Sequence, residues 1–436
     1  MAEVKKYKSE PLKCWNKAKE LRIQYYKDYA EAKEKGGLRW SGGAEAIDVV
    51  PYAFGEDVHS LTAEPYGASI AFVPEFAHEC EAALEAKGWA RDMCAYMRNY
   101  LGSVLLDKYV FGGKFPKPDF NLQSGFCCTH AKWFQLASKW EDVPYFNIDI
   151  GMPPFWKEDF PNRQQYIVDQ LHESIEWMEK ITGRKCDDER LIEGVYNDSR
   201  MTSLWAKITE LNKHVPAPLD EKSMYSLYVF VTLDRAKKEF VDFYEELYEE
   251  TKYRVENNIA ALATERFRLM SDSQPPWAFL NVWRYLEQFG VVSTGSIYTV
   301  GLEGVWDIDE EWNMTPREDL KSSGVEIKTR DDALREMANW HMRRPIYAMF
   351  YNADWKSQLM KKYAEEWKCD AAMLHLNRGC EGTSLGIMEN RAALLKTGLP
   401  VLTYEGNMGD DRDFDEPRTM ARIDAFMESM ALKKLT

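Results

Sequence analysis

The feature that most constrains the fold is a strand, helix, strand succession near the end of the chain. Residues 371–376 (AAMLHL) form an almost wholly apolar run, which is typical of a strand buried on both faces of a sheet. Helical spacing follows over 383–396, and a second apolar run covers 400–404 (PVLTY). Two strands joined by a helix predict parallel pairing, so this region is expected to be α/β.

The same alternation occurs in two other parts of the chain. The first contains predicted helices over 91–106 and 129–140 and predicted strands over 118–122 and 143–150. The second follows Pro275 and Pro276, with predicted helices over 277–288 and 331–343, a strand over 290–293 and a last helix over 416–431. Both parts favour parallel α/β sheets.

Long charged stretches with few glycines separate these units. Residues 234–270 are interpreted as one long helix or a broken pair, and weaker strand predictions fall on 46–50 and 69–73. The expected fold is therefore α/β, with two parallel-sheet units of Rossmann-like or flavodoxin-like type and added helical regions. The predicted parts are an N-terminal helical segment (1–45), a first α/β domain (46–160), a helical insertion (161–274) and a second α/β domain (275–436).

The charge balance limits the partners. The chain has 56 Lys and Arg against 71 Asp and Glu, a net charge of −15, which argues against nucleic acid and anionic membrane surfaces. No export signal and no run of ~20 apolar residues is evident, so no membrane span is expected. We expect a cytoplasmic protein whose eight cysteines are mostly reduced thiols.

Several common functional motifs are absent. The sequence contains no Walker A loop, no G-x-G-x-x-G after a strand, no H-E-x-x-H and no C-x-x-C. It also contains no G-x-S-x-G elbow. A nucleotide-binding P-loop, a standard dinucleotide fold and a zinc ribbon are therefore not expected.

Three cysteines share one structural context. Cys127 and Cys380 each follow a predicted strand and precede a helix, and Cys94 lies near the start of the helix over 91–106. Free N–H groups and partial positive charge at helix N-termini lower a thiol's pKa and stabilise anions, including an iron–sulfur cluster. Glycines at 125, 379 and 382 are expected to let the backbone approach such a group closely.

The spacing of these cysteines does not decide between a metal site and a structural role. It matches no compact ferredoxin motif, and free cysteine is among the most buried residue types, so spacing alone favours structural thiols. Of adjacent Cys127 and Cys128, one is expected to face a cluster and the other to pack. Four further cysteines are interpreted as structural: Cys14, Cys80, Cys186 and Cys369.

Several segments resemble the benzoyl-CoA reductase and 2-hydroxyacyl-CoA dehydratase family. They are 92–99 (DMCAYMRN), 127–134 (CCTHAKWF), 377–382 (NRGCEG), 275–277 with 290–299 (PPW, GVVSTGSIYT) and 398–402 (GLPVL). The resemblance runs from about residue 45 to the C-terminus. Within the family, the chain is most similar to the B subunits of ATP-dependent (class I) benzoyl-CoA reductases.

The resemblance implies a cofactor, partners and a reaction. It implies a 4Fe-4S cluster on Cys94, Cys127 and Cys380, with one iron free of thiolate. It implies a homologous sister subunit, an ATP-hydrolysing iron–sulfur activator, ferredoxin as the electron source and an aromatic acyl-CoA substrate. The chain is therefore expected to be part of an oxidoreductase that reduces the aromatic ring of benzoyl-CoA to give a cyclohexadiene-carbonyl-CoA.

Other polar residues are weaker candidates. His130 is interpreted as packing at its helix start, with a proton-donor role as the alternative, and Glu381 as a carboxylate stabilised by a helix N-terminus. The acidic run 409–416 (GDDRDFDE) is interpreted as a solvated turn or a contact for the sister subunit, and Arg266 and Arg268 as surface charges on a helix.

Two alternatives to the reductase remain open. The first is a 2-hydroxyacyl-CoA dehydratase subunit of the same fold. The second is a non-catalytic assembly or electron-relay subunit whose cysteines are structural or bind zinc.

Overall fold

The first unit is built around a four-stranded parallel sheet. The computed structural model describes residues 5–44, 47–125, 127–150 and 161–435. In this sheet the strand order is β3-β2-β4-β5, and every neighbouring pair is parallel. The strands are β2 (Leu38–Gly42), β3 (Val58–Thr62), β4 (Phe120–Ser124) and β5 (Tyr145–Ile148). The helices of this part are α1 (Trp15–Glu31), α2 (Val49–Tyr52), α3 (Ala63–Ala71), α4 (Pro74–Glu85), α5 (Ala95–Leu106) and α6 (Cys128–Glu141).

The second unit contains another four-stranded parallel sheet, in the order β12-β11-β7-β8. Its strands are β7 (Phe267–Asp272), β8 (Val291–Gly295), β11 (Ala371–Asn377) and β12 (Val401–Gly406). The central β11 is almost entirely buried, as expected for a parallel strand with both faces covered. The accompanying helices are α12 (Asn281–Glu287), α13 (Ile297–Gly301), α15 (Ile346–Tyr351), α16 (Ala353–Glu366), α17 (Glu381–Ser384), α18 (Ile387–Lys396) and α19 (Glu416–Ser429). Helix α14 (Arg330–His341) falls in the same stretch of the chain but packs against α7 (Pro161–Thr182) and α8 (Asp188–Glu210).

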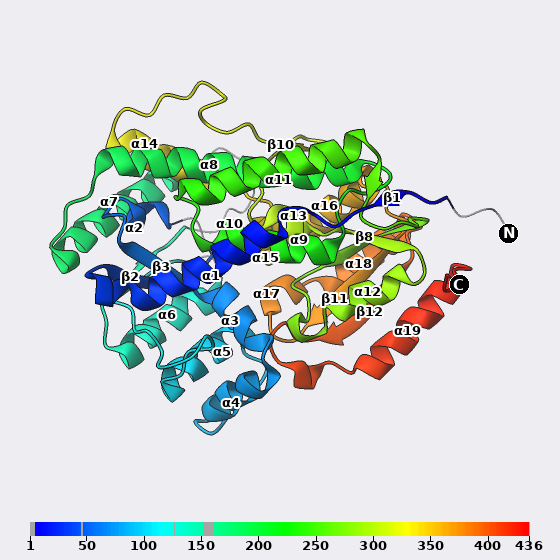
Figure 1. The fold of residues 1–436 in the computed structure, drawn as a ribbon, viewed down its shortest axis with the longest axis horizontal. Coiled ribbons are helices and arrows are strands. Elements are labelled where there is room, and N and C mark those ends of the chain that lie inside the picture. Colours follow the sequence, from blue (N-terminus) through cyan, green and yellow to red (C-terminus); the bar gives the residue numbers. More distant parts are fainter. Residues whose placement is uncertain (1–4, 45–46, 126, 151–160, 436) are drawn as a thin grey trace.

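A helical layer connects the two units. The long helices α8 and α11 pack side by side across the top of the view in Figure 1, and the short α17 lies near the middle of the molecule. The layer consists of α7 (Pro161–Thr182), α8 (Asp188–Glu210), α9 (Glu221–Leu227), α10 (Val229–Leu233) and α11 (Lys238–Glu256). Two small strand pairs, β1 (Lys8–Ser9) with β6 (Ile259–Ala260) and β9 (Trp306–Ile308) with β10 (Met314–Pro316), complete the strands of the described residues.

The structure confirms the α/β class, and it corrects several predicted elements. The run 234–270 is not continuous helix, because α11 ends at Glu256 and β7 begins at Phe267. The apolar runs 46–50 and 69–73 were expected to be strands. Residues 49 and 50 of the first run belong to α2, and 69–71 of the second belong to α3, while residue 46 lies outside the described ranges. Short apolar runs cannot distinguish a buried helix from a strand.

The first strand of each sheet precedes the boundary predicted for its domain. Strand β2 ends before residue 45, and β7 ends before residue 274. Within the described ranges, no helix combines the length and apolar character needed to cross a bilayer.

Candidate functional site

A cavity of about 440 Å³ lies between the two α/β units. Its lining comes from α3, α5 and α6 on one side and from α13, α15, α17 and the loop after β7 on the other. Two of its segments follow the carboxyl ends of the parallel strands β4 and β11, where open α/β sheets bind their ligands. The cavity therefore occupies the expected place for a functional site in this fold.

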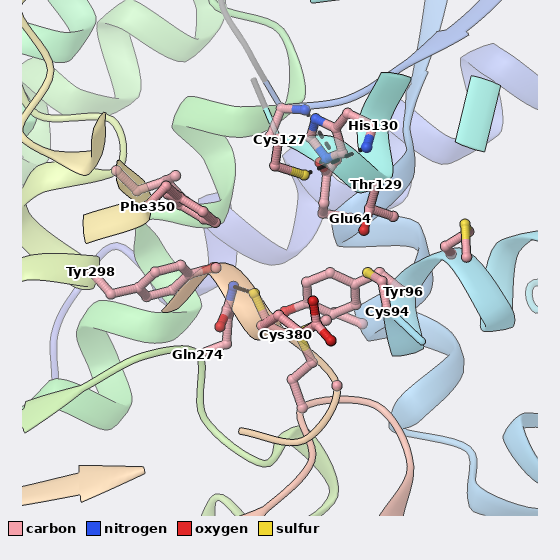
Figure 2. Close-up of a pocket in the computed structure, with 18 of the residues that line it drawn as sticks. Glu64, Cys94, Tyr96, Cys127, Thr129, His130, Gln274, Tyr298, Phe350 and Cys380 are labelled. Carbon is pink, nitrogen blue, oxygen red and sulfur yellow. Dashed lines mark hydrogen bonds and ion pairs between the residues drawn. The ribbon is translucent and has the colours of Figure 1, made fainter. Parts of the chain in front are cut away.

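Cys94, Cys127 and Cys380 all line this cavity. They are the N-cap residues of α5, α6 and α17, so each predicted position at a helix start is confirmed. Figure 2 shows the three side chains reaching the cavity from different sides. Among the described residues, no three His, Cys, Asp or Glu side chains come close enough together to hold a single metal ion.

Two thiols of this cavity, Cys94 and Cys127, are strongly desolvated. Burial raises the pKa of Cys94 to about 12, and the nearby Cys380 contributes in the same direction. Burial also raises the pKa of Cys127 well above its usual value, although the His130 backbone N–H donates to its sulfur at 3.5 Å. Without a metal these two thiols are protonated, so binding of a metal group has to release protons.

A carboxylate and a histidine form a pair on the cavity wall. Glu64, in the first turn of α3, pairs through Oε1 with Nε2 of His130, as Figure 2 shows. The Gly43 backbone N–H, which can only donate, bonds to Gln123 Oε1 and thereby fixes the orientation of that amide. Gln123 Nε2 consequently donates to His130 Nδ1 at 3.0 Å, which leaves the ring proton on Nε2, facing Glu64.

The remaining wall is largely aromatic. Tyr298 and Tyr228 share a hydrogen bond of 2.8 Å between their hydroxyls, and Trp277 Nε1 donates to the Tyr96 hydroxyl. The ring of Phe350 lies against Gly382, where a Cβ would stand 2.1 Å from Phe350 Cδ1. The glycine at 382 therefore makes room for an aromatic side chain of the protein, rather than for close backbone approach to a bound group as predicted.

The structure revises three of the weaker candidates and agrees with a fourth. Cys128 is exposed at the cavity, so the prediction that one of the adjacent cysteines packs in the core is wrong. Glu381 is exposed in the first turn of α17, as interpreted from the sequence. Arg268 is buried in strand β7, and its guanidinium forms an ion pair with the Glu265 carboxylate at 2.5 Å. Arg266 directly precedes that strand, so neither arginine lies on a long helix.

The other four cysteines do not line the cavity. Two of them, Cys14 and Cys80, are buried, and burial raises the pKa of Cys14 to about 12. Cys186 is buried near the start of α8, and Cys369 is half-buried ahead of β11. Their positions are those of packed structural thiols.

The acidic run 409–416 is not a simple solvated turn. Asp410 is fully buried and accepts a 3.0 Å hydrogen bond from Arg98, which is also fully buried. Burial alone would raise the pKa of Asp410, but Arg412 and Arg98 outweigh it and hold that pKa at about 2. Because Arg98 lies one turn after Cys94 in α5, these contacts attach the Cys94 helix to the loop after β12.

Replacing Arg98 by methionine should destabilise the protein by about 3–5 kcal/mol, because it removes the buried guanidinium between the buried carboxyl groups of Asp410 and Glu81 and leaves them only the partly exposed Arg412. The matched control is Arg91→Met, whose side chain is 48% exposed and pairs with Asp413 at 3.0 Å. This change should cost at most about 1 kcal/mol. Urea unfolding checks both, and equal losses would contradict the role given to burial.

Sequence reasoning missed Glu64 and Gln274. Gln274 follows the carboxyl end of β7, where ligand-binding residues of parallel sheets lie. It was missed because the start of β7 fell in the stretch 234–270, which was expected to be helical. Glu64 carries no motif, and its segment gave no signal of helix α3. Both residues enter the site only through the packing of elements that are distant in sequence.

The fold and the cavity together define a class, a two-sheet α/β protein with a thiol-lined cavity between its sheet units. The chain belongs to the 2-hydroxyglutaryl-CoA dehydratase D-component family, whose model matches residues 46–430. This confirms the resemblance expected from the sequence. It makes the chain an acyl-CoA dehydratase- or reductase-type subunit.

Individual relatives come from both branches of the family. The chain is 29% identical to the (R)-2-hydroxyisocaproyl-CoA dehydratase alpha subunit of Clostridioides difficile, over 95% of each chain. It is 25% identical to the alpha subunit of the lactoyl-CoA dehydratase of Anaerotignum propionicum, over 95% of this chain and 96% of the relative. It is 24% identical to the B subunit of the benzoyl-CoA reductase of Thauera aromatica, over 80% of this chain and 79% of the relative.

Proposed function

We propose that this chain is the α-type subunit of an (R)-2-hydroxyacyl-CoA dehydratase in which Cys94, Cys127 and Cys380 hold a 4Fe-4S cluster. The observation that carries the proposal is the convergence of these three N-cap thiols on one cavity that also contains the Glu64–His130 pair. The names of the dehydratase relatives support this choice over the reductase expected from the sequence.

The donor set of the cavity fits an iron–sulfur cluster. Thiolates are the usual protein ligands of such clusters, and each of these thiols lies at a helix N-terminus, where anions are favoured. Three protein ligands leave one of four irons without a thiolate. When bound, the cluster would supply a low-potential electron and an open iron corner to the substrate.

The chain's own residues would handle the proton. Removing water from a 2-hydroxyacyl thioester takes the hydroxyl from C2 and a proton from C3. Glu64 Oε1 accepts the His130 Nε2–H, and Oε2 accepts the Ala44 backbone N–H at 3.0 Å, so the carboxylate is held in a fixed orientation. Glu64 is thereby suited to accept the C3 proton as a general base, while the aromatic wall excludes water from the acyl group.

The proposal includes partners. A heteromeric complex is supported by the relatives, which are named as subunits. We propose a homologous sister subunit, an ATP-hydrolysing iron–sulfur activator, ferredoxin as electron source and a cytoplasmic location.

The second candidate function is that of a subunit of a benzoyl-CoA reductase. The Thauera aromatica relative favours it, and the aromatic side chains of the cavity suit a flat ring. In this case the complex adds electrons and protons to the aromatic ring of benzoyl-CoA instead of eliminating water.

Turnover by the anaerobically purified complex separates the two candidates. The chain is combined with its sister subunit, the activator, ATP and a low-potential reductant, and is given either a panel of (R)-2-hydroxyacyl-CoA thioesters or benzoyl-CoA. We expect the mass of an enoyl-CoA, lower by one water, from at least one hydroxyacyl thioester. Formation of a cyclohexadiene-carbonyl-CoA, with no dehydration of any hydroxyacyl thioester, would contradict the proposal and establish the reductase.

A further inference from the structure

Gln274 presents its side-chain amide to one of the three thiols. It lies two residues beyond the end of β7, is only 6% exposed and lines the cavity. Its Nε2 donates a hydrogen bond of 3.6 Å to Cys380 Sγ, a normal length for a sulfur acceptor. Figure 2 shows the nitrogen of Gln274 turned toward the Cys380 sulfur and the amide oxygen turned away from it.

The orientation of this amide is determined by a chain of obligatory donors. The backbone N–H groups of Gly379 and Met408 both donate to Asn377 Oδ1 at 3.1 Å, so the other end of the Asn377 amide has to be its NH2 group. That NH2 group donates to Gln274 Oε1 at 3.0 Å. The oxygen of Gln274 therefore faces Asn377, and its nitrogen faces Cys380.

Two hydroxyls and a histidine hold Gln274 further in place. Ser273 and Thr383 donate to Gln274 Oε1 at 2.9 and 3.0 Å. The His375 ring donates through Nδ1 to the Gln274 backbone oxygen at 2.7 Å. Rotation of the side-chain amide away from Cys380 would break the contacts made by its Oε1 inside a buried site, where unsatisfied polar groups are costly.

Cys380 differs from Cys127 in the source of its donor. Cys127 receives a backbone N–H from His130. No single substitution removes a backbone N–H without altering the chain itself. The donor to Cys380 belongs to a side chain, so it can be removed alone.

We propose that Gln274 is a positioning residue whose N–H···S bond raises the reduction potential of the cluster held through Cys380. The inference rests on the proposed function, because it requires a cluster at this site. Reduction adds negative charge to a cluster and its sulfurs, and an N–H donor stabilises the more negative state. The wild-type amide thus makes the cluster easier to reduce by its electron donor.

The test is an EPR-monitored redox titration of the anaerobically reconstituted protein. At a given solution potential, Gln274→Leu should lower the ratio of reduced to oxidised cluster roughly tenfold, about 59 mV for one electron. Gln274→Glu keeps an acceptor for Asn377, Ser273 and Thr383 but replaces the donor by a negative oxygen. Its potential should therefore fall further than that of Gln274→Leu.

The control is Gln358→Leu, which changes a half-buried glutamine of α16 that does not line this cavity and should leave the potential unchanged. Equal potentials in the wild type and both Gln274 variants would overturn the inference while leaving the proposed function intact. An equal shift in the Gln358 variant would also overturn it. A wild-type protein without iron would instead overturn the proposed function, and the inference with it.

Discussion

Three single variants, Cys94→Ala, Cys127→Ala and Cys380→Ala, should each lower the iron content of the anaerobically purified protein by roughly tenfold or more. Each of these residues supplies one of the three thiols that, within the described part of the chain, line the cavity from a helix N-cap. Loss of one leaves two corners of the proposed cluster anchored and two exposed to exchange. Iron and acid-labile sulfide analysis measures the effect, and the EPR signal of the reduced protein should disappear with the iron.

The matched control is Cys186→Ala. Cys186 is buried near the start of α8 and does not line the cavity, so this variant should keep the iron content of the wild type. The same iron content in all four variants would contradict the ligand assignment. Zinc without iron in the wild type would favour the assembly or relay role with zinc-binding cysteines.

Replacing Glu64 by glutamine should lower kcat of the complex by roughly 10²–10⁴-fold, the range typical of a lost general base. The amide keeps the size of the side chain but cannot accept the substrate proton. Iron content and cluster EPR should remain those of the wild type, because Glu64 is not a proposed ligand. Turnover of a 2-hydroxyacyl-CoA by the complex, normalised to iron, gives the measurement.

Glu381→Gln provides a second carboxylate at the same cavity as a control. Glu381 is exposed in the first turn of α17, so its loss should change kcat little. If Glu64→Gln and Glu381→Gln lower kcat equally, the base is not Glu64. If Glu64→Gln also loses iron, its role is structural.

Local sequence patterns were sufficient for most elements of the two sheets. The apolar run 371–376 and the periodic stretch 383–396 predicted β11 and the helical region of α17 and α18, because burial on both faces and helical periodicity leave clear patterns. Strand β7 escaped prediction. Its residues 267–272 (FRLMSD) include the buried Arg268, whose charge is neutralised by Glu265, and only tertiary pairing makes such a segment a central strand.

Some residues of the candidate site could likewise be predicted from local sequence patterns, and others could not. Cys94, Cys127 and Cys380 were singled out by their positions at helix starts, since capping is a local property, and the family resemblance implied their role as ligands. Glu64, Gln274 and the buried Arg98–Asp410 pair could not be predicted, because their roles depend on neighbours that are up to 312 residues away in the chain. The charge run containing Asp410 looked solvated only because Arg98 belongs to the other unit.

The sequence by itself determined the parallel α/β class, the cysteines at three helix starts and the family resemblance, because each depends on short-range pattern or on motifs read in order. Only the tertiary structure decided that the three cysteines line one cavity, that the Glu64 carboxylate faces His130 there, and that the Gln274 amide points at sulfur. These features are orientations of side chains from segments that are distant in the sequence and meet only when the two sheet units pack. No local sequence pattern specifies them. They follow from how buried donors and acceptors satisfy one another once the two units have packed.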